Sequence, residues 1–242
     1  MKLVVIGDIH GKDIWKKIIE KEKDADKIIF LGDYLDSIDI GVKKQVKNFI
    51  DLLEFKRDNP EKVILLFGNH DYHYLPMAFS RQETYSGFRH TLYKSINVRM
   101  NTNVTNNTLQ MCYKHQNILF SHAGITKTWC ENSNIDLDNI EHSINSLFKK
   151  DIHPFKFHNF NPNNKSMSRS DPYGDNVYQS PTWVRPYSLI QDKLDGYIQV
   201  VGHTKTKFNG VQSFKDIFFT DCLDLGEGYL VIEGTEFIPT LL

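Results

Sequence analysis

Short apolar runs that alternate with helical patterns constrain the fold of this chain more than any other feature of its sequence. The runs are Leu3–Ile6, Lys27–Leu31 and Lys62–Phe67, each of a length typical of a buried strand. Residues 13–23 and 41–55 lie between them and carry apolar side chains at helical spacing. Strands that alternate with helices over short connections predict right-handed crossovers and a parallel sheet.

The rest of the chain predicts further strands, two helices and one long loop. Helical spacing is present near 88–95 and 135–149, and 109–113 with 117–120 reads as a β-hairpin. A stretch rich in Asn, Pro, Ser and Asp predicts a polar loop or lid around 157–180. No repeat or linker divides residues 1–242, so we expect one domain. The last expected strands are 196–201, 216–220, 229–232 and 236–238.

Composition excludes several classes of protein. With 40% hydrophobic and 24% charged residues, the chain is not intrinsically disordered. Its net charge of −1 disfavours stable nucleic-acid binding, and no apolar run approaches the roughly 18 residues of a membrane span. Three cysteines without CxxC spacing indicate free thiols in a reducing compartment. We expect a cytoplasmic globular protein, with its oligomeric state left open.

Metal-capable side chains follow the predicted strands. The carboxyl ends of strands in an open α/β sheet are where ligands collect, so these side chains are expected to meet. A Gly-Asp pair after a strand is often only a turn, but five such motifs in order are unlikely to arise by accident. The motifs are GDIHG at 7–11, GDYLD at 32–36, GNHD at 68–71, SHAG at 121–124 and GHT at 202–204. They supply Asp8, His10, Asp33, Asn69, His122 and His203.

The chemistry of these side chains points to two divalent ions. Oxygen and imidazole ligands without thiolate suit Mn, Fe or Zn better than they suit a closed structural zinc site. A carboxylate such as Asp33 can bridge two ions about 3.5–4 Å apart. We expect Mn²⁺ foremost, with Fe or Zn as the alternatives.

The motifs resemble those of the calcineurin-like metallophosphoesterases, in particular serine/threonine protein phosphatases and bacterial dinucleoside tetraphosphate hydrolases. The resemblance implies a four-layer α-β-β-α sandwich of two mixed sheets. It also implies a dinuclear phosphoesterase that hydrolyses phosphate monoesters, of a phosphoprotein or a small ester, through a metal-bound hydroxide. Asp8 and His10 would hold the first ion and Asp33 would bridge to the second. The second ion would be completed by Asn69, His122 and His203.

Three further residues would carry the reaction. His70 is placed to protonate the leaving group, and Asp36 would hold that imidazole protonated, although Asp36 is also a candidate helix N-cap. Arg185 stands where the family places a phosphate-binding arginine, with a surface position as the alternative. Protein phosphatases carry a second arginine where this chain has Ser37, which we expect to donate a hydrogen bond to substrate. Lys205 replaces the last histidine of the GHxH motif found in many relatives.

Other functions stay open at this stage. The stretch 121–126, with Trp129 after it, is similar to the dinucleoside tetraphosphate hydrolases, and the missing second arginine also favours a dinucleoside polyphosphate hydrolase. A third possibility is a catalytically dead scaffold, which the intact set of ligands disfavours. A nuclease is disfavoured by the near-neutral charge and the missing GHxH ending.

Overall fold

A computed structural model describes residues 1–85, 87–157, 175–208 and 210–242 of the protein. Most of the predicted polar loop around 157–180 therefore lies outside the described residues. The strands are β1 Lys2–Ile6, β2 Lys27–Phe30, β3 Val63–Leu66, β4 Leu109–Gln110, β5 Cys112–His115, β6 Ile118–Ser121, β7 Ile198–Val201, β8 Gln212–Phe214, β9 Ile217–Phe219, β10 Gly228–Glu233 and β11 Glu236–Leu241.

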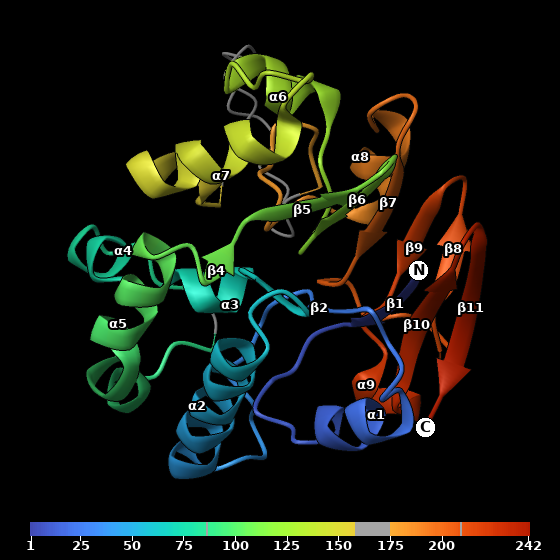
Figure 1. Cartoon of the computed structure of the whole chain (residues 1–242). Helices are drawn as coiled ribbons and strands as arrows, with labels where there is room; N and C mark the ends of the chain where they lie inside the picture. Colours follow the sequence, from blue (N-terminus) through green and yellow to red (C-terminus); the bar gives the residue numbers. More distant parts are fainter. Residues whose placement is uncertain (86, 158–174, 209) are drawn as a thin grey trace.

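The described helices lie between and beyond these strands (Figure 1). They are α1 Trp15–Lys21, α2 Val42–Asp58, α3 Asn69–Tyr72, α4 Pro76–Ser80, α5 His90–Thr105, α6 Lys127–Asn132, α7 Ile140–Lys150, α8 Pro186–Gln191 and α9 Leu223–Gly226, with a 3₁₀ turn at His153–Phe155.

Two mixed sheets are formed from the described strands. The first runs β11-β10-β1-β2-β3-β4, with β1, β2, β3 and β4 parallel and β10 antiparallel to β1. The second runs β5-β6-β7-β9-β8, with β6, β7 and β9 parallel. The parallel half predicted from the alternating pattern is confirmed, and so is the pair of mixed sheets.

Side-chain alternation shows how the sheets pack. In β1, Val4 and Ile6 pack with the apolar faces of α1, α2 and α5, whereas Leu3 and Val5 point to the opposite face. That opposite face meets the second sheet, because Leu3 and Val5 share one buried cluster with Phe120 of β6. Helix α8 covers the far face of the second sheet. The layers are therefore helices, sheet, sheet and helices, as predicted.

The hairpin predicted at 109–113 and 117–120 is wrong in one respect. Leu109 and Gln110 pair with β3 in the first sheet, and the chain then crosses to the second sheet before β5 pairs with β6. The crossing is stabilised by Asn145 of α7, whose Oδ1 accepts hydrogen bonds from the backbone N–H of Met111 and Cys112 at 2.8 and 3.1 Å. A local pattern does not reveal this distant acceptor.

Two predicted helices have different bounds. Helix α5 continues past residue 95 to Thr105, because Leu92, Ile96 and Met100 form one buried stripe under an otherwise polar helix. Helix α7 begins at Ile140 rather than near 135, since Asp136 turns the preceding chain by accepting from the N–H of Asp138. Among the described residues, no helix is both long and apolar enough to cross a bilayer. All three cysteines are buried free thiols.

Candidate active site

The carboxyl ends of β1, β2, β3, β6 and β7 converge on one cavity of about 430 Å³. Each of these strands is buried and ends in one of the five motifs, so the sheet packing delivers the motif side chains to one place. The cavity is lined by Asp8, His10, Asp33, Asn69, His70, Tyr85, Phe157, Trp183, Arg185, His203, Lys205 and Asp221.

His10 presents an unprotonated nitrogen to two carboxylates. Its Nδ1 donates to the carbonyl of Leu35 at 2.7 Å, so the proton lies on that nitrogen. Its Nε2 lies 3.7 Å from Asp33 Oδ2 and 4.0 Å from Asp8 Oδ2. Burial lowers the pKa of His10, which favours the neutral ring. A lone pair and two carboxylates facing one point are suited to bind a cation.

A second group of acceptors surrounds Asn69. His122 Nδ1 donates to the carbonyl of Leu31 at 2.9 Å, which leaves the lone pair of Nε2 only 2.8 Å from Asn69 Oδ1 and 3.5 Å from Asp33 Oδ2. His203 Nδ1 also lies 2.8 Å from that amide oxygen. Burial lowers the pKa of both histidines, and the buried His203 Nε2 has no partner among the described residues. These donor atoms fit a second divalent ion, with Asp33 shared between the two groups.

The surroundings disfavour the charged form of two of the three buried carboxylates that line the cavity. Burial and then the carboxylates of Asp221 and Asp33 raise the pKa of Asp8 well above its usual range. Burial, followed by the Asp33 carboxylate, raises the pKa of Asp221 to about 7. Burial alone would also raise the pKa of Asp33, but four surrounding imidazoles, led by His122, lower it below its usual value. Bound cations would remove the penalty on Asp8 and Asp221.

Four residues of the site have strained backbone conformations. His10, Asp33, Asp36 and His203 all have positive φ, at 41°, 52°, 68° and 63°. Such conformations cost about 1–3 kcal/mol each and persist where the surrounding structure imposes them. These conformations turn the chain sharply after β1, β2 and β7, next to the cavity.

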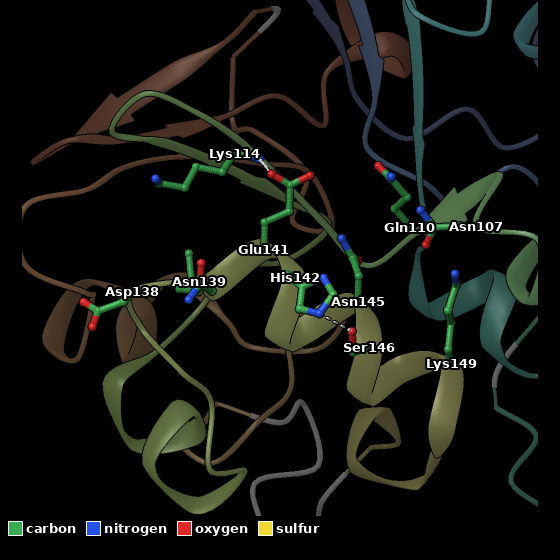
Figure 2. Close-up of a pocket in the computed structure, with 11 residues that line it drawn as sticks. Asn107, Gln110, Lys114, Asp138, Asn139, Glu141, His142, Asn145, Ser146 and Lys149 are labelled. Atoms are coloured by element: carbon green, nitrogen blue, oxygen red, sulfur yellow. Dashed lines mark hydrogen bonds between the residues drawn. The ribbon is translucent and has the colours of Figure 1, made fainter.

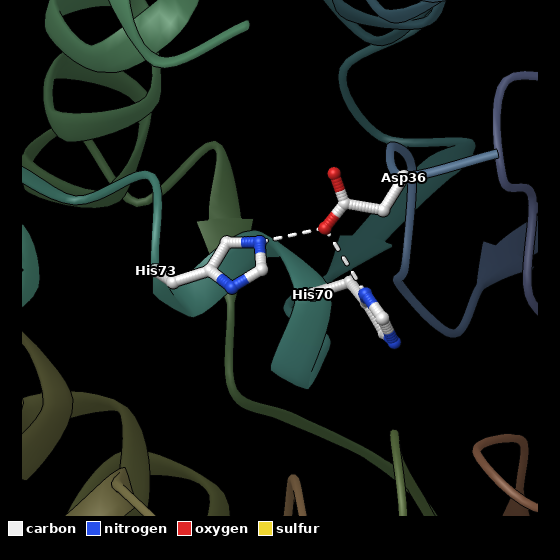
Figure 3. Close-up of side chains that lie close together, drawn as sticks. All are labelled: Asp36, His70 and His73. Atoms are coloured by element: carbon white, nitrogen blue, oxygen red, sulfur yellow. Dashed lines mark hydrogen bonds and ion pairs between the residues drawn. The ribbon is translucent and has the colours of Figure 1, made fainter. Parts of the chain in front are cut away.

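His70 is one of two imidazoles held by Asp36 (Figure 3). Asp36 Oδ2 lies 3.0 Å from His70 Nδ1 and 2.6 Å from His73 Nε2, and Tyr74 donates to its other oxygen. Burial alone would lower the pKa of His70, but Asp33 and Asp36 raise it to about 9. The alternative of Asp36 as a helix cap is wrong, because Gly41 occupies the N-cap position of α2.

Arg185 lies in the cavity rather than at an isolated surface position. It precedes α8, and its Nη1 donates to Thr204 Oγ1 at 3.1 Å. Lys205 also lines the cavity and pairs with Asp224 at 2.7 Å.

Ser37, by contrast, does not line the cavity. Its Oγ accepts from the N–H of Ile40 at 3.2 Å, and its carbonyl accepts from Gln45 and Arg89. Ser37 therefore organises a turn, and the structure brings it no contact with the site.

Sequence reasoning assigned no role to Asp71 or His73. Asp71 is fully buried, and its carboxylate accepts from the N–H groups of Asp33, Tyr34 and Gly68 at 2.9–3.0 Å, which orders two of the motifs. His73 holds Asp36. The GNHD motif contained a signal for Asp71. The sequence near Tyr72 and Tyr74 made His73 a candidate to line the pocket, with ordinary packing favoured, and gave no sign of its contact with Asp36.

A second cavity of about 420 Å³ lies between α7 and β5 (Figure 2). Its most constrained polar groups are already used for structure. Glu141 accepts from the N–H of Lys114 at 3.0 Å, and Asn145 bonds Met111 and Cys112. These side chains satisfy the open edge of β5, so this cavity shows no convergence of chemical groups like that around Asp33.

The sequence matches the calcineurin-like phosphoesterase family over residues 1–206. The chain therefore belongs to the calcineurin-like phosphoesterases and is a metal-dependent phosphatase of the hydrolase class.

Solved structures show the same fold. The chain is similar to a cold-active protein-tyrosine phosphatase of a psychrophile, Shewanella sp., with TM-score 0.60 and 19% identity over 99% of this chain and 77% of that one. It is also similar to a protein serine/threonine phosphatase from Saccharomyces cerevisiae that resembles human PP5, with TM-score 0.53 and 13% identity over 99% and 79% of the two chains. No curated protein matches the sequence.

Proposed function

We propose that this protein is a dinuclear metal-dependent phosphoesterase that hydrolyses phosphate monoesters. The observation that carries the proposal is the pair of groups that share Asp33, whose Oδ2 lies 3.7 Å from His10 Nε2 in one group and 3.5 Å from His122 Nε2 in the other. Asp8 and His10 hold the first ion, and Asn69, His122 and His203 hold the second. The oxygen and nitrogen ligands favour Mn²⁺, with Fe or Zn as alternatives.

Two ions bound here would supply a hydroxide nucleophile at neutral pH and neutralise charge on the phosphate. The chain's own residues do the rest. Arg185 binds phosphate oxygens from the cavity wall. His70 donates its proton to the departing ester oxygen. Asp36 stabilises the protonated ring of His70 and fixes its orientation through the contact with Nδ1.

The monoesterase is favoured over the dinucleoside polyphosphate hydrolase by the position of residues 121–126. Ser121 and Thr126 are buried, and their hydroxyls accept from the N–H groups of Gly124 and Trp129. Apart from His122, which lies against Asn69 and Asp33, the stretch that resembles the nucleotide hydrolases thus supports the fold and adds no residue to the lining of the cavity. The solved neighbours are described as protein phosphatases, which favours a phosphoprotein or a small ester as substrate.

The test measures inorganic phosphate released by the full chain in Mn²⁺ from a phosphopeptide, and AMP, ADP and ATP formed from diadenosine tetraphosphate, whose cleavage releases no inorganic phosphate. Asp33→Asn serves as the blank, because loss of the shared carboxylate should release both ions and abolish turnover. Asp39→Asn is the matched control, since Asp39 is exposed near the same loop. Cleavage of the nucleotide alone would replace the monoesterase proposal, and wild-type turnover by Asp33→Asn would refute the shared ligand.

A further inference from the structure

Three aromatic rings on one side of the active-site cavity have no part in the proposed mechanism. Tyr85, Phe157 and Trp183 all line the cavity. Their ring centroids lie 4.7 Å apart for Tyr85 and Trp183, 4.9 Å for Phe157 and Trp183, and 6.1 Å for Tyr85 and Phe157. The interplanar angles of 64–70° are the edge-to-face geometry that aromatic rings prefer. We call this cluster the aromatic wall.

The aromatic wall extends from the metal ligands to the histidine that protonates the leaving group. At one end, the ring of Trp183 lies 5.9 Å from the ring of His203. At the other end, the N–H of Tyr85 donates to His73 Nδ1 at 3.3 Å, and the opposite nitrogen of His73 bonds Asp36. Tyr85 is therefore tied through its backbone to the group formed by His73, Asp36 and His70, and both Tyr85 and His70 line the cavity from which the ester oxygen departs.

The wall is held in place before substrate binds. Trp183 is only 8% exposed and is fixed by its two aromatic neighbours. The hydroxyl of Tyr85 accepts from the N–H of Phe157 at 3.0 Å, which joins two segments far apart in the sequence. Tyr85 and Phe157 remain partly exposed, so they present apolar surface to a cavity whose other walls are mostly charged. Rigid aromatic surface binds flat groups at low entropic cost.

We propose that the aromatic wall binds an aryl leaving group, and that the substrates of this enzyme are aryl phosphate monoesters. This inference rests on the proposed function and names its substrate class. Water oxygen forms the new bond to phosphorus, and the bond between phosphorus and the aryl oxygen breaks. The departing oxygen keeps the electron pair and takes the proton of His70, which gives a phenol and inorganic phosphate. The aryl group comes from a phosphotyrosine side chain or from a small molecule.

The test compares two esters whose leaving groups have nearly equal acidity but different aromatic area, phenyl phosphate and 2-naphthyl phosphate. We expect the wild-type protein with Mn²⁺ to favour the naphthyl ester in kcat/KM. Phe157→Leu and Tyr85→Leu should each reduce that preference about five-fold, because they remove one ring contact. Phe237→Leu is the matched control, since Phe237 stacks on Phe218 at 4.4 Å in a different part of the fold. Metal content checks that each variant is folded.

The two outcomes separate this proposal from the function on which it rests. If the wild type and both wall variants release phosphate with the same preference for the naphthyl ester over the phenyl ester, the role of the aromatic wall is wrong and the proposed phosphoesterase activity stands. Silence on every monoester would overturn both. A phosphotyrosine peptide and a phosphothreonine peptide of the same sequence then distinguish the sources. If the enzyme prefers the phosphotyrosine peptide and Phe157→Leu reduces that preference, the substrate is a protein. If the enzyme prefers the naphthyl ester but cleaves the two peptides at equal rates, the substrate is a small aryl ester.

Discussion

At the scale of single residues, backbone carbonyls fix which nitrogen each of two proposed metal-binding histidines presents to the site. The carbonyls of Leu35 and Leu31 accept from Nδ1 of His10 and His122, so each ring must present Nε2 to the cavity as a lone pair. Such a bond to the second nitrogen fixes the tautomer and orients the ligand before metal arrives. Because burial also lowers the pKa of both rings, the two proposed ligands are neutral imidazoles at neutral pH.

Replacing His70 tests its role in protonating the leaving group. His70→Asn should keep both metal ions, since His70 is not among the proposed ligands. Turnover should fall about 100-fold or more for alkyl phosphates, which need a proton as they leave, and much less for 4-nitrophenyl phosphate, which does not. Steady-state rates across a series of leaving groups, together with metal content, provide the measurement. An equal loss for every leaving group would exclude the general-acid assignment.

At the scale of elements, the loop before α5 fixes the position of His70. Gly87 has φ of +94°, and a Cβ atom there would lie 3.2 Å from two atoms of the His70 ring. Gly87→Ala should therefore displace the imidazole and lower kcat about ten-fold or more, in addition to a backbone cost of roughly 1–2 kcal/mol.

Gly196→Ala is the control for this loop, because Gly196 also has positive φ, +78°, but a Cβ atom there would meet nothing within 4 Å. Both variants should lose similar stability in urea unfolding, and only Gly87→Ala should lose turnover. If the two variants kept the same kcat, contact between the loop and His70 would not matter for the reaction.

The edge of β5 gives a prediction about stability at the same scale. Asn145 accepts from two backbone N–H groups and donates to the Cys112 carbonyl at 2.8 Å, so its loss leaves three polar groups without partners. Asn145→Ala should reduce the free energy of unfolding by about 1–3 kcal/mol. Urea denaturation measures the change, and Ser146→Ala on the exposed face of α7 should be near neutral. If Asn145→Ala left the free energy of unfolding unchanged, water would be replacing the hydrogen bonds of the amide.

The sequence predicted the parts of the site that depend on strand ends. Asp8, His10, Asp33 and Asn69 follow apolar runs, and a parallel sheet brings such positions together. His203 follows an apolar run of the second sheet, and the packing of the two sheets brings it to the same cavity.

Contacts between distant elements were not predictable in the same way. The bond from His73 to Asp36 depends on how the chain folds after β3, and the break between β4 and β5 depends on Asn145 from α7. No local pattern encodes either contact, because each joins residues more than 30 positions apart.

At the scale of the whole molecule, packing of the two sheets buries acidic groups beside one another. Leu3, Val5 and Phe120 help to close the interior between the sheets, and Asp8 and Asp221 lie in the cavity beyond it with little exposure. The fold therefore concentrates negative charge in a place poorly reached by water. In the absence of metal, these carboxylates should either stay protonated or destabilise the fold. Bound cations should remove this destabilisation.

Asp221→Asn tests this cost through its dependence on pH. The pKa of Asp221 is raised to about 7 in the folded protein, against about 4 when unfolded, so the folded state holds the extra proton between these values. Wild-type apoprotein therefore loses the stability that comes from this group as pH rises from about 4 to 7. The asparagine side chain in the Asp221→Asn variant does not titrate. In EDTA, the free energy of unfolding of this variant should therefore increase relative to that of the wild type between pH 5 and pH 8. Excess Mn²⁺ should reduce this difference in the free energy of unfolding. A difference that depends on neither pH nor metal would show that the neighbouring groups do not raise the pKa of Asp221.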